Sequence, residues 1–146
     1  MRCLLFCFTF GFLFCLRLAG HPSDSLVTQA QEWESTKLFF KVNEVSGDLD
    51  NPLDVRLQYL QIGRDRALRD DNMVKLSDYT NKIAVAHTEL GLNQSALEYS
   101  LEALKLAREM GDLYQEIWAL YRLSEVHSIL KNTELALEDG RTALLR

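Results

Sequence analysis

Beyond residue 15 the sequence contains no cysteine. Its three cysteines, Cys3, Cys7 and Cys15, all lie in a short apolar stretch at the start of the 146-residue chain. A chain body without thiols can form no disulfide framework, and it offers neither a cysteine nucleophile nor a thiolate metal ligand. This absence excludes disulfide-stapled domains and cysteine-dependent enzymes, although it does not exclude secretion.

Proline and glycine are also scarce, with two prolines and seven glycines in the whole chain. Because both residue types interrupt helices, their scarcity permits long helices. Hydrophobic residues make up 47% and charged residues 25%, a balance typical of a folded globular protein. Alanine, leucine, glutamate, lysine and arginine dominate the second half of the chain, and all five favour helices. The composition therefore predicts a single all-α domain.

The chain also has no excess of positive charge. The formal net charge is −5, from 16 basic and 21 acidic residues. The first 20 residues hold two arginines and no acid, so the rest carries 14 bases against 21 acids, a net charge of −7. An acidic body repels nucleic-acid phosphates and anionic membrane surfaces. The arginines between residues 56 and 69 alternate with aspartates, which favours a salt-bridged helix face, and we expect no nucleic-acid partner.

Residues 1–20 form an apolar leader whose composition differs sharply from that of the rest of the chain. Cys3 to Leu16 is an uncharged run of 14 residues between Arg2 and Arg17. It is shorter than the about 20 residues that span a bilayer. The pattern resembles a secretory signal peptide, although Arg17 lies where cleavage would occur. Two alternatives are an apolar helix that packs on the first repeat and an alternative or misassigned start. Residues 21–31 are polar and predict a linker.

The body of the chain repeats itself at a spacing of forty residues. Residues from 73 onward match those from 113 onward over 34 positions without a gap. The matched pairs are His87 with His127, Leu90 with Leu130, Ala96-Leu97-Glu98 with Ala136-Leu137-Glu138, and Ala103-Leu104 with Ala143-Leu144. A weaker match precedes them, with Gly63 opposite Ala103. We therefore expect a divergent repeat at 32–72, a repeat at 73–112 and an incomplete repeat at 113–146.

Each repeat is predicted to form two helices. In the middle repeat the expected core residues of the first helix are Leu76, Ile83, Ala84, Ala86 and Leu90, and those of the second are Ala96, Leu97, Leu101, Leu104 and Ala107. Gly91 and Gly111 end these helices, because glycine readily takes the left-handed conformation of a helix C-terminal cap. Helices joined by such short turns pack as antiparallel neighbours.

These residues carry a family resemblance. The pattern Ile83-Ala84-x-x-His87-x-x-Leu90-Gly91, followed by Ala96-Leu97-Glu98-Tyr99-x-x-x-Ala103-Leu104-x-x-Ala107, resembles the tetratricopeptide repeat in its forty-residue variety. The second copy runs from Leu123 to Leu144, with Lys131 in place of the turn glycine. Both copies depart from the family at two positions where an aromatic residue is usual. The first position holds His87 and His127, and the second holds Ser100 and Gly140.

The resemblance implies a right-handed α-solenoid of antiparallel helix pairs, whose first helices line a concave groove for a partner peptide or helix. The sequence stops at Arg146, within the expected second helix of the last repeat, so the solenoid is expected to be truncated at its C-terminal end. Solenoids normally end in a polar-faced capping repeat. We therefore expect either a fragment, a truncated isoform or an incomplete gene model, or self-association through the uncapped end.

Carried over onto this sequence, the resemblance implies a set of groove residues on the first helices. They are Asp78, Asn81, Val85 and Thr88 in one repeat and Trp118, Tyr121, Glu125 and Ser128 in the next. Trp118 and Tyr121 have the most weight, because exposed aromatic residues anchor many interfaces. Packing of both against a neighbouring helix is an equally favoured alternative. Among the positions of the family's carboxylate clamp only Arg122 has the right type, so a receptor for C-terminal carboxylates is disfavoured.

No catalytic, metal-binding or cofactor-binding pattern is found. His87 and His127 have no carboxylate or thiol at helical spacing that would complete a metal site, so we expect them to pack between helices. Asp48-x-Asp50-Asn51 lacks the glycine and glutamate of a calcium loop and predicts a turn with side-chain caps. No glycine-rich phosphate loop occurs. We expect no enzyme activity, no cofactor and no small-molecule substrate.

The expected function is that of a non-catalytic scaffold or adaptor in the cytoplasm. Several proteins with similar repeats serve cytoskeletal, motor, ciliary or flagellar assemblies, and the resemblance extends this setting to the present chain. The alternative is a secreted or lumenal protein of the same fold that enters the secretory pathway by its leader. Asn93-Gln94-Ser95 is an acceptor sequence for N-glycosylation, and in that case Asn93 would carry a glycan.

Overall fold

The computed structural model describes residues 33–146, so the expectations for the leader and the linker lie outside the described residues. The described part is all-α, as the composition predicts, and contains no strand. Its six helices are α3 (Ser35–Gly47), α4 (Leu53–Arg69), α5 (Met73–Glu89), α6 (Asn93–Met110), α7 (Leu113–Ile129) and α8 (Thr133–Leu144). None of these helices combines the length and the apolar composition that crossing a bilayer requires.

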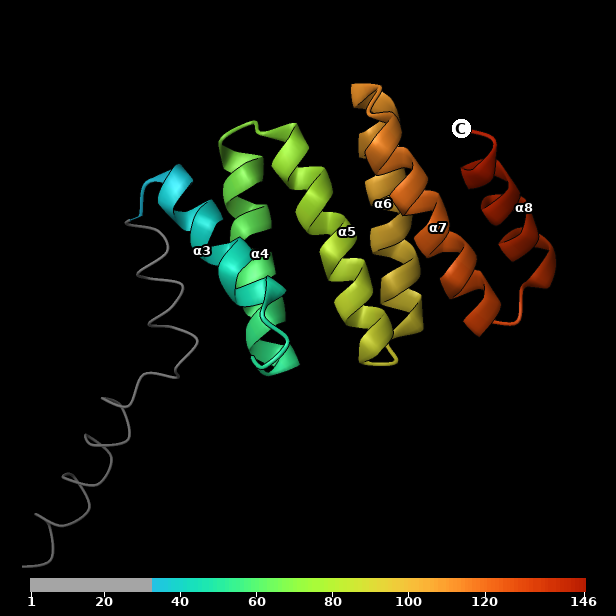
Figure 1. Cartoon of the computed structure of the whole chain (residues 1–146), viewed down its shortest axis with the longest axis horizontal. Helices are drawn as coiled ribbons and strands as arrows, with labels where there is room; N and C mark the ends of the chain where they lie inside the picture. The colour runs from blue at the N-terminus through green and yellow to red at the C-terminus, as the bar shows by residue number, and fades with distance from the viewer. Residues whose placement is uncertain (1–32) are drawn as a thin grey trace, which may run out of the picture. The chain divides into compact units, whose positions relative to one another are not determined.

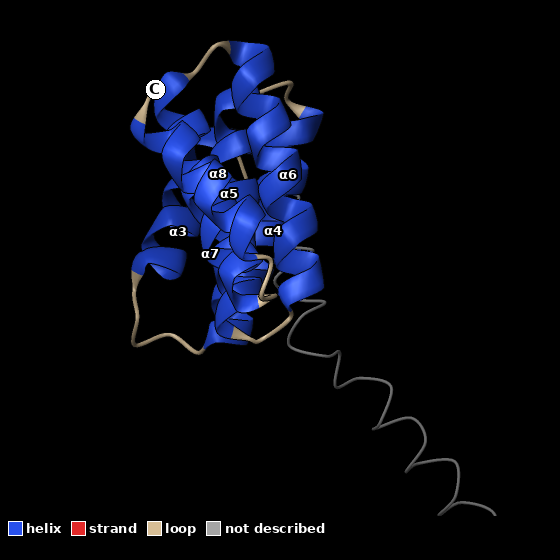
Figure 2. Ribbon diagram, turned by 90° about the vertical axis from the view of Figure 1, so that its right-hand side faces the viewer, coloured by secondary structure: helices blue, strands red, loops and turns tan. Residues whose placement is uncertain are grey.

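Consecutive helices pack as antiparallel neighbours, which confirms the prediction from the short turns. Every pair of consecutive helices from α3 to α8 is in contact, and α5 also contacts α7 (Figure 1). Figure 2 shows that helices joined by short loops make up this whole part of the chain. Contacts between successive helices are thus the main source of tertiary stability.

The starts of the helices recur at the same forty-residue spacing as the sequence. Helices α4, α6 and α8 begin at residues 53, 93 and 133, and α5 and α7 begin at 73 and 113. The turns between them share one geometry. Each has a residue with positive φ, twenty positions apart, namely Asp71, Gly91, Gly111 and Lys131. The next amide N–H then donates to a carbonyl five residues back, as in Leu92 to His87 at 2.9 Å.

The first turn departs from this geometry. Helix α3 ends at Gly47, two residues before the counterpart of the end of α5 at Glu89. The Asp50 N–H donates to Asp48 Oδ1 at 3.0 Å, and Asn51 Nδ2 donates to the Val45 carbonyl at 3.1 Å. Side chains therefore close this turn, which explains why the sequence match fails there.

Small residues let the helices pack closely. Ala84, Ala96 and Ala103 are all buried, as the repeat predicts. Two predicted core positions are wrong, because Leu90 and Leu101 are about half exposed. Leu90 follows the end of α5, where the chain turns away from the core. The buried face of α6 instead includes Ala96, Ser100, Ala103 and Ala107, a spacing of four, three and four residues that leaves Leu101 on the opposite side.

Gly63 lies where side chains of α3 and α5 pack closely on α4. A Cβ atom at Gly63 would lie 3.0 Å from Val42 of α3 and 3.0 Å from Tyr79 of α5. Tyr79 is fully buried, and its hydroxyl donates to the Phe39 carbonyl at 3.3 Å. Burial also raises the pKa of the Tyr79 phenol above its ordinary value. This contact joins α5 to α3 across the glycine of α4.

Candidate partner-binding groove

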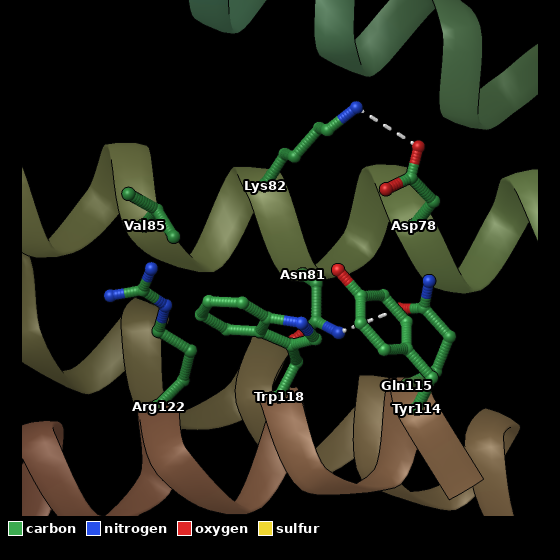
Figure 3. A pocket seen from close by; sticks show the side chains of 8 residues that line it. All are labelled: Asp78, Asn81, Lys82, Val85, Tyr114, Gln115, Trp118 and Arg122. Atoms are coloured by element: carbon green, nitrogen blue, oxygen red, sulfur yellow. Dashed lines mark hydrogen bonds and ion pairs between the residues drawn. The ribbon is translucent and has the colours of Figure 1, made fainter. Parts of the chain in front are cut away.

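Two adjoining hollows lie along α7. The first, here called the α5/α7 hollow, has a volume of about 190 Å³ and is lined by Asp78, Asn81, Lys82, Val85, Tyr114, Gln115, Trp118 and Arg122 (Figure 3). The second, here called the α7/α8 groove, has a volume of about 970 Å³ and is lined by Ile117, Trp118, Tyr121, Arg122, Ser124, Ala136, Leu137, Gly140, Arg141, Ala143 and Leu144. Trp118 and Arg122 line both, so the two hollows meet at these side chains.

Helical spacing brings the lining residues of α5 and α7 together. Asp78, Lys82 and Val85 are four and three residues apart and therefore share one face of α5. Both helices begin with a side-chain cap. Asn72 accepts a hydrogen bond from the Lys75 N–H at 3.1 Å in α5, and Asp112 accepts one from the Gln115 N–H at 3.0 Å in α7. Each cap satisfies a backbone N–H group in the first turn of its helix.

Asn81 carries a buried acceptor at the α5/α7 hollow. The residue is 8% exposed, and its Nδ2 donates to Gln115 Oε1 at 3.1 Å, which links α5 to α7 (Figure 3). Its Oδ1 is buried and has no hydrogen-bond partner among the described residues. A buried carbonyl without a partner is unfavourable by about 1–3 kcal/mol.

The charges at the α5/α7 hollow are paired within the chain. Lys82 Nζ lies 3.0 Å from Asp78 Oδ2 and donates to Asn43 Oδ1 at 3.2 Å. Arg122 Nη1 lies 2.8 Å from Glu125 Oε2. Partly exposed pairs of this kind contribute about 1 kcal/mol or less. The α5/α7 hollow therefore has charged groups that largely neutralise one another.

Three aromatic side chains follow one face of α7. Tyr114, Trp118 and Tyr121 stand four and three residues apart, with ring centroids 6.2 Å and 6.0 Å apart in edge-to-face contacts. The guanidinium of Arg122 lies 5.8 Å from the Trp118 ring and 5.1 Å from the Tyr121 ring. Trp118 is still 41% exposed. These contacts hold the rings in place while leaving much of their surface uncovered.

Five of the eight predicted groove residues line a hollow, and three do not. Asp78, Asn81, Val85 and Trp118 line the α5/α7 hollow, and Trp118 and Tyr121 line the α7/α8 groove. Thr88, Glu125 and Ser128 line neither hollow. The Thr88 hydroxyl donates to the Ala84 carbonyl of its own helix at 3.0 Å, Glu125 pairs with Arg122, and Ser128 is exposed near the end of α7.

Sequence reasoning missed several lining residues. Lys82 and Tyr114 could have been found, because each lies four residues from a predicted groove residue on the same helix face. Leu137 and Arg141 of α8 could not, because the resemblance places the groove on the first helix of each pair. The α7/α8 groove depends on how α7 and α8 pack against each other, which is a property of the tertiary structure.

The two histidines pack between helices, as expected. The His87 ring lies 5.0 Å from the Tyr99 ring, and both of its nitrogens are buried without a partner among the described residues. Burial lowers the pKa of His87. His127 Nδ1 lies 2.7 Å from Asp139 Oδ2. Within residues 33–146 no group of three or more histidine, cysteine, aspartate or glutamate side chains is placed to hold a metal ion.

No family model, no curated protein and no solved structure matches the chain.

Proposed function

We propose that this chain is a non-catalytic interaction module that holds a peptide or helix of a partner protein along α7. One observation carries the proposal: Tyr114, Trp118 and Tyr121 form an ordered, half-exposed aromatic cluster where the α5/α7 hollow meets the α7/α8 groove. Large aromatic side chains supply much of the binding energy in protein interfaces. A concave, mostly apolar surface with a few polar groups is also a typical binding site.

We further propose that the helix pairs form a right-handed α-solenoid of the tetratricopeptide type. The forty-residue spacing of α4, α6 and α8 and the twenty-residue spacing of the left-handed turn residues support this architecture. In such a solenoid each unit contacts its neighbours and the first helices form a continuous binding surface. The proposal includes a role as a scaffold or adaptor in the cytoplasm, in a cytoskeletal or ciliary assembly, and this setting rests on the resemblance alone.

The test is a selection of peptides from a displayed random library on the purified chain, followed by titration calorimetry. We expect Trp118→Ala to weaken the selected peptides by about thirty-fold, because a central aromatic anchor contributes about 2 kcal/mol or more. Phe40→Ala is the matched control, since Phe40 is an exposed aromatic residue of α3 that lines neither hollow. Peptides that bind Trp118→Ala as tightly as the unmodified chain would refute the site.

A further inference from the structure

The α5/α7 hollow is too small to receive a helix. Its volume is about 190 Å³, whereas one turn of an α-helix with its side chains fills roughly 500 Å³. The hollow therefore admits a few side chains of a ligand or a narrow extended segment. All of its lining residues belong to α5 and α7, so its shape does not depend on the open face of α8.

The oxygen acceptors of the α5/α7 hollow are already engaged or buried. Asp78 Oδ2 accepts a hydrogen bond from Lys82 Nζ at 3.0 Å (Figure 3). Gln115 Oε1 accepts one from Asn81 Nδ2 at 3.1 Å. Asn81 Oδ1 has no partner among the described residues, but it is buried and therefore not open to a ligand. A ligand rich in N–H groups would lose hydrogen bonds to water that the hollow does not replace.

Hydrogen-bond donors, in contrast, are free on the wall that α7 forms. The indole N–H of Trp118 and the hydroxyl of Tyr114 form no hydrogen bond with the residues that the structure describes. Both side chains are exposed. An indole N–H can only donate, and it needs an acceptor when a ligand covers it. The α5/α7 hollow thus suits a ligand that brings carbonyl oxygens and few N–H groups.

The same two side chains present apolar ring faces next to these donors. The Tyr114 and Trp118 rings lie side by side (Figure 3), with centroids 6.2 Å apart and planes inclined at 71°. The guanidinium of Arg122 lies 5.8 Å from the Trp118 ring, and Val85 lines the hollow from α5. Flat, non-aromatic rings pack well on surfaces of this kind, where an ordered aromatic pair offers contact area at low entropic cost.

We propose that the α5/α7 hollow binds a proline-rich segment of a partner protein in the polyproline II conformation. Proline has no backbone N–H, and the carbonyl oxygens of a polyproline II helix are free because that helix has no internal hydrogen bonds. Its pyrrolidine rings pack on Trp118 and Tyr114, and its carbonyl oxygens accept from the two free donors. Aromatic-lined grooves bind this conformation because it is formed before binding. The proposal rests on the proposed function and specifies its partner.

Two other kinds of peptide fit the α5/α7 hollow less well. The backbone carbonyls of a helical peptide are used within the helix, so the donors of Trp118 and Tyr114 would stay unmatched. An acidic peptide finds no free cation, because the two cations that line the hollow, Lys82 and Arg122, already form ion pairs within the chain. A segment with free carbonyls, apolar rings and no charge is the better occupant.

The experiment titrates the full chain with three capped peptides of about nine residues, made of proline, N-methylglycine or alanine. The N-methylglycine peptide lacks N–H groups, as proline does, but has no pyrrolidine rings. Titration calorimetry measures the three dissociation constants. We expect the proline peptide to bind about ten-fold more tightly than the alanine peptide, because its bound conformation is preformed, and the N-methylglycine peptide to lie between them.

Two tryptophan variants isolate the donor. Trp118→Phe keeps a ring and removes the indole N–H, and it should weaken the proline peptide about five-fold. Trp33→Phe is the matched control, because it removes the chain's other indole N–H from a residue that lines neither hollow, and it should change nothing. In the proton NMR spectrum of the unmodified chain, the Trp118 indole N–H resonance should move downfield when the proline peptide binds, while that of Trp33 stays in place.

Equal affinities of the proline and alanine peptides would overturn the inference, as would a proline peptide that does not bind at about 1 mM. Tight binding of the proline peptide to Trp118→Phe with no shift of the Trp118 resonance would overturn it too. If library peptides depend on Trp118 without being rich in proline, and the proline peptide does not bind, this inference fails and the proposed function stands. If no library peptide depends on Trp118, the proposed function fails as well.

Discussion

Single residues set the direction of the chain at four turns. Asp71, Gly91, Gly111 and Lys131 all have positive φ, with values of 52° for Asp71 and 63° for Lys131. Glycine adopts this conformation without steric cost, whereas other residues are strained by about 1–2 kcal/mol. The repeat therefore requires left-handed backbone every twenty residues, and the sequence supplies glycine at only two of these positions.

We predict that Lys131→Gly raises the free energy of unfolding by about 1 kcal/mol, because it relieves this strain. Gly91→Ala should lower the free energy of unfolding by a similar amount. A Cβ atom at Gly91 would have no neighbour within 4 Å, so the effect comes from the backbone and not from a clash. Urea denaturation measures both changes. Equal stability of all three proteins would contradict the assigned turn geometry.

His87 makes stability depend on pH. Its burial lowers its pKa below the ordinary value of 6.5, and its ring faces Tyr99, with Arg64 close to the same tyrosine ring. Well above pH 6.5 the residue is neutral in both states and contributes no pH dependence. As the pH falls below 6.5 the unfolded chain takes up a proton that the folded chain resists, so stability is lost.

We predict that His87→Phe reduces this loss of stability on acidification. The difference between the two proteins in free energy of unfolding should be nearly constant well above pH 6.5 and change as the pH falls through 6.5. Urea titrations between pH 8 and pH 5 measure it. Parallel curves over the whole range would show that His87 titrates normally in the folded chain.

At the scale of the element, most helix limits follow from local signals. Gly91 and Gly111 end α5 and α6, and Asp112 begins α7 with a side-chain cap. Which side chains of a helix are buried is less local. Leu101 is exposed although it is more hydrophobic than the buried Ser100. Close packing selects small residues for the contact face of α6, and hydrophobicity alone does not reveal which face that is.

The packing of α4 gives a prediction at this scale. Gly63→Val should lower the free energy of unfolding by about 1–3 kcal/mol, because its Cβ would lie 3.0 Å from Val42 and from Tyr79 in a buried site. Gly47→Ala is the matched control, since a Cβ there has no neighbour within 4 Å. Thermal unfolding followed by circular dichroism compares the two. A Gly63→Val protein as stable as the control would mean that α3 and α5 can move apart freely.

At the scale of the whole molecule, the compartment of the chain is predicted from residues 1–20. We predict that a full chain with a C-terminal tag remains in the cytosol with an intact N-terminal mass and no glycan on Asn93. The physical reason is Arg17, which lies in the region where a signal peptidase would cut. Cell fractionation, mass spectrometry and glycosidase treatment measure the three properties. A cleaved and glycosylated product would instead support the secreted alternative.

The sequence by itself determined the helical class, the antiparallel succession of helices and the forty-residue repeat. These properties depend on residue spacing and on turn chemistry, which act over a few positions along the chain. It also pointed to Trp118, Tyr121 and Asn81. Only the tertiary structure decided that Asn81 is buried with a free acceptor and that α8 contributes Leu137 and Arg141 to a groove. Burial and grooves depend on which helix lies against which, and that information is spread over side chains forty residues apart.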